Sequence, residues 1–221
     1  MDALRIDTEG PVAILTMGSG ENRIGAAAVA ALNDAFDAFE RDASVTSVVI
    51  TGEDRYWSTG LDLDEMRGMG NSEQRTFMRS VDLLLGRILT SPLVTVAALN
   101  GHTYAAGALL ALAHDYRIMR ADRGFFCLPS VDVGIPFSPG MSALIAAKLP
   151  QPIAHDLVVS CRRIGGVEAA QTGVVHRAVG EANVLHVARE LAHAYSGKDG
   201  STLHAVKRRM YPETAAMLTV D

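Results

Sequence analysis

Ser130 and Asp132 are the polar side chains in the segment FFCLPSVDVGIPF, residues 125–137, and both could assist proton transfer. An apolar run ends just before them and Gly134 follows, a pattern typical of a segment that presents a side chain. A carboxylate acts directly as a general base, whereas a serine hydroxyl near pH 7 needs a neighbouring histidine. In an extended segment, alternate residues share a face about 7 Å apart, so Asp132 would assist at Ser130 only through water or a bend.

Backbone donors are a second source of chemistry, predicted where two buried strands lead through a glycine turn into a helix. The first corner is SVVITGEDRYWSTGLDLDEM, residues 47–66, and the second is LVTVAALNGHTYAAGALLALAH, residues 93–114. The first amide groups of a helix lack intrahelical partners and carry the positive end of its dipole. Two such donors on one oxygen form an oxyanion hole, worth ~10² to 10³ in rate per donor. A single glycine turn is more commonly a packing device, so the hypothesis depends on the pair.

Length and composition indicate one folded domain. The chain has 221 residues, of which 48% are hydrophobic and 20% are charged, enough to bury a core. Its net charge of -5 argues against nucleic-acid binding, which requires a basic face. The N-terminal MDALRIDTEG lacks the features of a signal peptide, and polar residues interrupt the most apolar stretch before it could span a membrane. Cys127 and Cys161 lack metal or redox spacing and are typical of buried, reduced thiols in a cytoplasmic protein.

Hydrophobic periodicity places these motifs on alternating strands and helices. Strands are predicted in a hairpin over residues 4–17 and at 47–52, 93–99, 115–119 and 124–128. Helices are predicted over 29–39, 71–91, 105–114 and 141–149, with Asn71 and Gln74 forming a capping box. The order predicts an α/β core over residues 1–180, followed by a helical C-terminal region, 181–221, in the same domain.

Three segments together resemble the signatures of the crotonase, or enoyl-CoA hydratase/isomerase, superfamily. WSTGLDLDEM (57–66) is similar to its first oxyanion segment, ALNGHTYAAGALLALAHDYRIM (98–119) to its second, and FFCLPSVDVGIPF to its third signature. The resemblance covers most of the chain and is closest to the Δ3,Δ2-enoyl-CoA isomerase branch, through NGH, AHDY and VDVGIPF. It implies the α/β crotonase fold, in which repeated ββα units form a spiral core with a helical C-terminal part.

By motif position, the carbonyl-binding amides of the family fall on Leu61, which follows Gly60, and on Ala106, which precedes Gly107. The resemblance implies that these amides hold an acyl-thioester carbonyl and stabilise the enolate formed from it. Because the donors are backbone groups, leucine and alanine side chains are compatible with this role. Asp62 is interpreted as a cap or turn residue of the next helix rather than as a catalytic group.

Both positions at which the family carries acid/base glutamates are changed in this sequence. The first falls on Leu109, and the second, on which the isomerase branch depends, falls on Ser130. Shifting a double bond requires a base that moves a proton from C2 to C4, and a positioned side chain supplies ~10² to 10⁴ of the rate. We therefore predict weak or absent isomerase and hydratase activity on ordinary enoyl-CoA esters, with acyl-CoA binding retained.

Further contacts are expected from the resemblance and from charge. Side chains and turns predicted to bind the substrate are Arg55, Trp57, Gly60, Met66, Tyr104 and Gly107. Phosphates of coenzyme A are expected at Arg55, Lys207 and Arg208, although a solvated helix face accounts equally well for the KRR run. The resemblance implies no metal, no cofactor beyond the coenzyme A of the substrate, and assembly as a homo-trimer or hexamer through C-terminal helices.

Three functions stay open on this basis. The first is an enoyl-CoA isomerase or hydratase in which Asp132, Tyr104 or water replaces the usual base. The second is a catalytically silenced carrier or sensor of acyl-CoA. The third is a thioester hydrolase or decarboxylase in which Ser130 orients water or a carboxylate over the amide pair.

Overall fold

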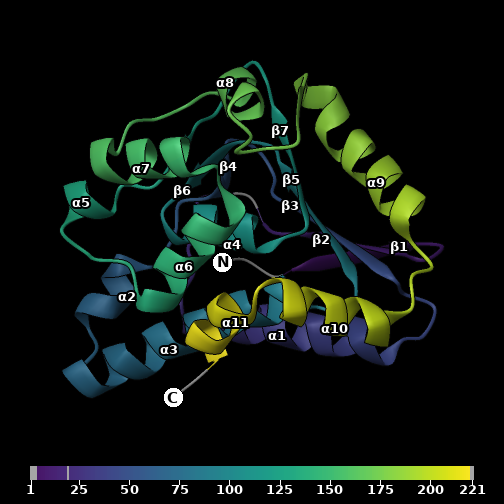
Figure 1. Cartoon of the computed structure of the whole chain (residues 1–221), viewed down its shortest axis with the longest axis horizontal. Helices are drawn as coiled ribbons and strands as arrows, with labels where there is room; N and C mark the ends of the chain where they lie inside the picture. The colour runs from purple at the N-terminus through teal and green to yellow at the C-terminus, as the bar shows by residue number, and fades with distance from the viewer. Residues whose placement is uncertain (1–3, 19, 220–221) are drawn as a thin grey trace.

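The computed structural model describes residues 4–18 and 20–219, and a six-stranded sheet forms its centre (Figure 1). The strand order is β1-β2-β3-β5-β7-β9. The first two strands, β1 (Arg5–Glu9) and β2 (Val12–Thr16), form the predicted antiparallel hairpin. All later neighbours are parallel: β3 (Ser47–Thr51), β5 (Val94–Leu99), β7 (Tyr116–Arg120) and β9 (Arg177–Val179).

Strands β2, β3 and β5 are buried along their whole length, because helices cover both faces of the sheet. Alternate side chains point to opposite faces. Val12 and Ile14 of β2 therefore pack with α9 (Val184–Tyr195), whereas Ala13 and Leu15 join the main core. That core includes the apolar stripes of α1 (Ala26–Arg41) and α3 (Asn71–Leu89), which lie across the sheet from α9 (Figure 1).

A second, smaller sheet positions the segments that carry the motifs. Its parallel strands are β4 (Tyr56–Ser58), β6 (His102–Tyr104) and β8 (Phe126–Cys127). Each follows a strand of the large sheet and precedes a helix: α2 (Leu63–Arg67), α4 (Ala106–Ala113) or α5 (Ser130–Val133). The ββα unit thus occurs three times in succession, as expected for the crotonase fold. Because parallel strands end at the same edge, residues 59–61, 105–106 and 129–130 are brought to one place.

The C-terminal part is helical, as predicted, and it packs on the core rather than standing apart. Besides α9, it contains η1 (Glu181–Asn183), α10 (Gly200–Met210) and α11 (Pro212–Thr219), whereas α6 (Pro139–Lys148), α7 (Gln151–Ser160) and α8 (Gly166–Gln171) precede residue 181. Leu218 of α11 lies against Gly86 of α3 and Gly140 of α6. No helix within residues 4–18 and 20–219 has the length and apolar character that crossing a membrane requires. Cys127 and Cys161 are buried and free.

One local prediction was wrong, and one open alternative is decided. The segment at Ser130 is bent rather than extended, since residues 130–133 form one helical turn that ends at Gly134 with φ +67°. The cap of α3 is Gly70, one residue before the predicted Asn71, and Glu73 accepts a hydrogen bond from the Gly70 amide at 2.7 Å. In a full capping box the cap side chain also accepts a hydrogen bond from the third helical residue. Gly70 has no side chain, so only the bond from its amide to the Glu73 carboxylate forms.

Candidate functional site

The two amide corners meet at the ends of β4 and β6. Gly60 has φ +98°, and a Cβ built on it would lie 3.0 Å from Ala106 N and 2.8 Å from Ala105 Cβ. Only glycine combines that dihedral angle with so close an approach. Ala105 has φ +51° and ψ −124°, a conformation that costs an alanine ~1–3 kcal/mol and is typical of functional turns. Leu61 and Ala106 are therefore held side by side.

Within the described residues, neither the Leu61 nor the Ala106 amide donates a hydrogen bond to the protein. The bridge between Ile24 and Leu61 uses flanking groups, because Ile24 N donates to Gly60 O at 2.7 Å and Asp62 N donates to Ile24 O at 3.0 Å. Ala106 is the first residue of α4, where an amide has no intrahelical partner. Two unused donors thus belong to residues that line one cavity.

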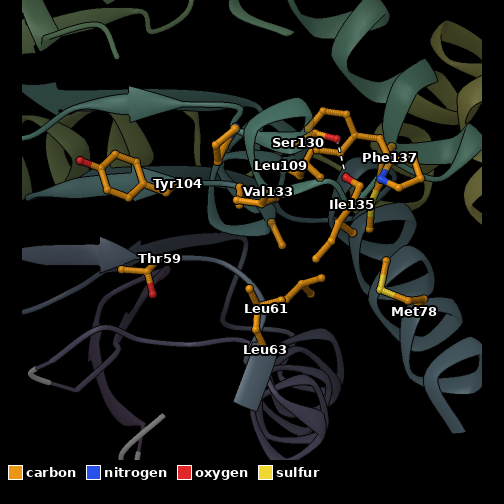
Figure 2. A pocket seen from close by; sticks show the side chains of 15 residues that line it. Thr59, Leu61, Leu63, Met78, Tyr104, Leu109, Ser130, Val133, Ile135 and Phe137 are labelled. Atoms are coloured by element: carbon orange, nitrogen blue, oxygen red, sulfur yellow. Dashed lines mark hydrogen bonds between the residues drawn. The ribbon is translucent and has the colours of Figure 1, made fainter. Parts of the chain in front are cut away.

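The cavity beside these amides has a volume of about 170 Å³ and an apolar wall (Figure 2). Its apolar lining is Leu61, Leu63, Met78, Ala105, Ala106, Leu109, Pro129, Val133, Ile135, Pro136, Phe137 and Met141. Thr59, Tyr104 and Ser130 contribute the polar side chains. The described lining residues include no carboxylate and no imidazole. The cavity suits an acyl chain and offers that chain no strong base.

Ser130 lines this cavity, but its hydroxyl is engaged by the main chain. The residue is buried at 8% exposure, and its Oγ donates a hydrogen bond to the carbonyl of Ile135 (Figure 2). No hydrogen bond joins it to a described imidazole or carboxylate. Ser130 therefore lacks the activation that a nucleophilic or basic serine requires. Leu109, at the other position where the resemblance predicts a glutamate, is buried and apolar.

Asp132 is exposed and does not line the cavity. In an extended segment, Asp132 was expected to assist at Ser130 only through water or a bend. In the α5 turn, residues two apart point to different sides of the helix, so burying Ser130 directs Asp132 to solvent.

Tyr104 borders the cavity with its ring, while its hydroxyl points away from Leu61 and Ser130 (Figure 2). That hydroxyl lies 2.6 Å from Nδ1 of His102. Burial raises the pKa of the Tyr104 phenol, and burial together with nearby arginines lowers the pKa of His102. A phenol that is harder to ionise and directed elsewhere does not replace the missing glutamate.

Three other predicted substrate contacts lie elsewhere. Trp57 is fully buried in the core, where Nε1 donates to Ile50 O at 3.3 Å. Met66 lines a neighbouring depression with residues of α3. Arg55 is exposed on a separate cleft, with its guanidinium 5.3 Å from the centre of the Tyr56 ring. The aromatic residue of the first motif was misassigned because a strand of three residues gives no reliable alternation of faces.

Gly107 and Asp62 have structural roles. A Cβ on Gly107 would lie 2.7 Å from Ser58 Oγ, so this glycine permits α4 to pack against β4. Asp62 accepts hydrogen bonds from Asp64 N and Glu65 N, both at 3.1 Å. The interpretation of Asp62 as a helix cap is confirmed.

Lys207 and Arg208 lie far from the amide pair. Lys207 is 5% exposed, and its Nζ lies 2.8 Å from Leu93 O and 2.7 Å from Asp115 Oδ2. Leu93 and Asp115 lie just before the starts of β5 and β7. The amide pair lies beyond the other end of these strands, and the six residues of β5 alone span about 20 Å. The prediction that Lys207 binds a phosphate of coenzyme A was wrong, because its buried ammonium group forms an ion pair with Asp115.

Lys207→Met should lower the free energy of unfolding by about 3 kcal/mol, because it leaves Asp115 poorly compensated. Arg208→Met, one residue along on the exposed face of α10, should change stability by less than about 0.5 kcal/mol. Urea denaturation measures both effects. Acyl-CoA affinity should be the same in both variants, and a selective loss of affinity in Lys207→Met would restore the phosphate role.

Sequence reasoning missed most of the cavity wall. Ile135, Phe137 and Met141 of α6 are among the lining residues that it did not name. Met141 belongs to the predicted apolar stripe of its helix, but such a stripe equally predicts core packing. No local signal separates a side chain that faces a cavity from one that faces another helix.

Comparisons with known proteins agree with this geometry. The family described as enoyl-CoA hydratase/isomerase matches residues 7–219. Enoyl-CoA delta isomerase 3 of Arabidopsis thaliana is 30% identical, over 96% of this chain and 94% of the relative. Carnitinyl-CoA dehydratase of Salmonella arizonae is 32% identical, over 86% and 73% respectively. The crystal structure of human mitochondrial delta3-delta2-enoyl-CoA isomerase superposes with a TM-score of 0.90 at 26% identity, covering 97% of this chain and 85% of that one. The chain therefore belongs to the enoyl-CoA hydratase/isomerase family and has the crotonase fold.

Proposed function

We propose that this protein binds an acyl-CoA thioester, holds its carbonyl oxygen between the amides of Leu61 and Ala106, and turns over ordinary enoyl-CoA esters weakly or not at all. One observation carries the proposal: two adjacent, unused amides border an apolar cavity whose described lining contains neither carboxylate nor imidazole. The amides lower the energy of an enolate. The step that forms the enolate by removing a proton has no base.

Substrate class is supported by the relatives, which are named as enzymes of enoyl-CoA or carnitinyl-CoA. The coenzyme A moiety is part of that substrate. A contact between its phosphates and the exposed Arg55 stays a prediction. A homo-trimer or hexamer and a cytoplasmic location stay predictions, and one Arabidopsis thaliana relative is named as peroxisomal.

Calorimetric titration with crotonyl-CoA, followed by hydratase and isomerase assays on the same preparation, tests this proposal. We expect saturable binding, and turnover reduced ~10² to 10⁴ because the acid/base group is missing. A silenced carrier or sensor predicts the same result. Failure of several acyl-CoA esters to bind would contradict the proposed binding of acyl-CoA thioesters. Turnover at rates ordinary for enzymes would contradict the proposal that the site has no base for proton removal.

Decarboxylation is a second candidate, favoured by the apolar wall. Loss of CO₂ from a 2-carboxyacyl thioester breaks the bond between C2 and the carboxylate carbon and leaves its electron pair on C2 as an enolate, so the amide pair assists without any base. An apolar surrounding also destabilises the reacting carboxylate relative to water. Release of CO₂ from malonyl-CoA or a 2-alkylmalonyl-CoA would favour this function. Hydrolysis is less well supported, because the Ser130 hydroxyl donates its hydrogen bond to the carbonyl oxygen of Ile135 and has no described imidazole to activate it.

A further inference from the structure

All three lysines of the chain, Lys148, Lys198 and Lys207, line one cavity. The other seventeen basic residues are arginines, and none of them is among the described residues that line it. The cavity has a volume of about 500 Å³ and includes Val94 and Tyr116, the first residues of β5 and β7. It therefore lies at the opposite end of the large sheet from the amide pair.

Lys148 is the unusual member of this group. It is the last residue of α6 and is partly buried, yet within the described residues it has neither an ion pair nor a hydrogen bond. Its Nζ lies 5.2 Å from the centre of the Tyr211 ring, a cation–π contact. A lysine that is held at a cavity without an acid partner has its charge available for a ligand.

The surrounding charges leave this wall positive. Asp115 is already paired with Lys207, and its carboxylate also accepts from Thr95 N at 2.9 Å. Asp199 at the rim caps α10 through Thr202 N. Arg117 of β7 is fully buried and lies behind the lining residues. Its guanidinium donates hydrogen bonds to the main-chain carbonyls of Leu112, His114 and Val174 rather than to a carboxylate.

The pKa of Lys148 is set by its burial and by three charged neighbours, Arg117, Asp115 and Lys207. Burial, reinforced by Arg117 and Lys207 and opposed by Asp115, lowers the pKa of Lys148 to about 7. Burial also lowers the pKa of His114 and of His176 to about 4, so both imidazoles are neutral at pH 7 and add no charge. Tyr116, Tyr195 and Tyr211 complete the set, and burial raises the pKa of Tyr116 and Tyr211. An anion beside Lys148 would reverse the lowering by favouring the ammonium form.

The rest of the wall is aromatic and apolar. The rings of Tyr116 and Tyr195 are stacked with centroids 5.2 Å apart, and α10 contributes Leu203, Val206 and Met210. A volume of a few hundred cubic ångströms with apolar walls and few polar groups is typical of sites for small organic ligands. The wall lacks the planar guanidinium forks that favour phosphate.

We propose that this cavity is a second ligand site, which binds a small organic carboxylate with its carboxylate on the Lys148 ammonium and its aromatic or apolar body against Tyr116 and α10. The site is separate from the thioester cavity and does not depend on the function proposed for it. Lysine suits the role because it supplies a compact charge and can take up a proton when the ligand arrives, which arginine cannot do.

Calorimetry with benzoate as the probe tests the site, with benzamide as the neutral probe of the same shape. Wild-type protein should bind benzoate at least ten times more tightly than benzamide. Lys148→Met should weaken benzoate binding at least tenfold, whereas Lys148→Arg should keep it within threefold. Lys198→Met, at an exposed rim position, should have a smaller effect than Lys148→Met. Circular dichroism melting checks the fold of each variant, and Lys148→Gln replaces Lys148→Met should the latter unfold.

Proton linkage distinguishes Lys148 from any other cation. The free lysine is mostly neutral at pH 8, so benzoate binding there should take up most of one proton, and affinity should fall as pH rises above 7. Titrations in buffers of different ionisation enthalpy measure this uptake, which should vanish in Lys148→Arg. Absence of benzoate binding, equal binding of benzamide, unchanged affinity in Lys148→Met, or binding at pH 8 without proton uptake would each overturn the proposal.

Discussion

Ser130→Glu should raise the rate of 3-enoyl-CoA isomerisation ~10²- to 10⁴-fold over the wild-type protein. The substitution places a carboxylate at the family position on the wall of a cavity that already borders the two amides. It sacrifices one hydrogen bond, from Ser130 to Ile135 O, worth about 1 kcal/mol. The apolar surroundings should raise the pKa of the new carboxyl above the ordinary value of about 4.3, toward the operating pH, which improves a general base.

Two control variants isolate the carboxylate. The glutamine of Ser130→Gln has nearly the size of glutamate and removes the same hydrogen bond to Ile135, but it cannot act as a base. The isomerisation rate of Ser130→Gln should therefore stay at the wild-type level. Asp132→Glu lengthens a carboxylate that points to solvent, and it should also gain nothing. Initial rates with a 3-enoyl-CoA measure all three. A Ser130→Glu protein that binds acyl-CoA but is no faster than Ser130→Gln would show that the missing glutamate is not what limits catalysis.

Gly60→Ala should have the largest effect on the amide pair. A Cβ there would lie 2.8 Å from Ala105 Cβ and 3.0 Å from Ala106 N, and φ +98° is unfavourable for alanine. Strain and overpacking together should cost about 3 kcal/mol of unfolding free energy. The Ala106 amide must move away from Leu61. In the Ser130→Glu background, loss of one carbonyl donor should reduce the isomerase rate ~10² to 10³.

Gly134→Ala is the matched control for backbone strain. Gly134 also has positive φ, +67°, but a Cβ there meets nothing within 4 Å. It should cost only about 1 kcal/mol and leave the rate nearly unchanged. Urea denaturation gives the stabilities. The absorption band of a bound aryl-enoyl-CoA, which shifts to the red when its carbonyl accepts hydrogen bonds, reports the amides directly. An unaltered red shift in Gly60→Ala would contradict the assigned donor pair.

The sequence by itself determined the family and the fold class, and it predicts that Leu109 and Ser130 replace the family glutamates. These features are local: three short motifs, the alternation of the hairpin, and apolar stripes at helical spacing each lie within about twenty residues. Each strand, glycine turn and helix that form an amide corner also lie within one short segment, so both corners could be predicted from the sequence. The resemblance of the three motifs to the crotonase family implied the repeated ββα units.

Tertiary structure decided which side chains face the cavity beside Leu61 and Ala106. One helical turn at residues 130–133, instead of an extended segment, turned Asp132 to solvent while keeping Ser130 inside. Trp57 entered the core because the large sheet packs behind its short strand, and Lys207 was drawn into an ion pair with Asp115, 92 residues away in sequence. Contacts between distant segments set these directions, and hydrophobic periodicity carries no information about them. The gathering of Lys148 with the other two lysines has the same origin.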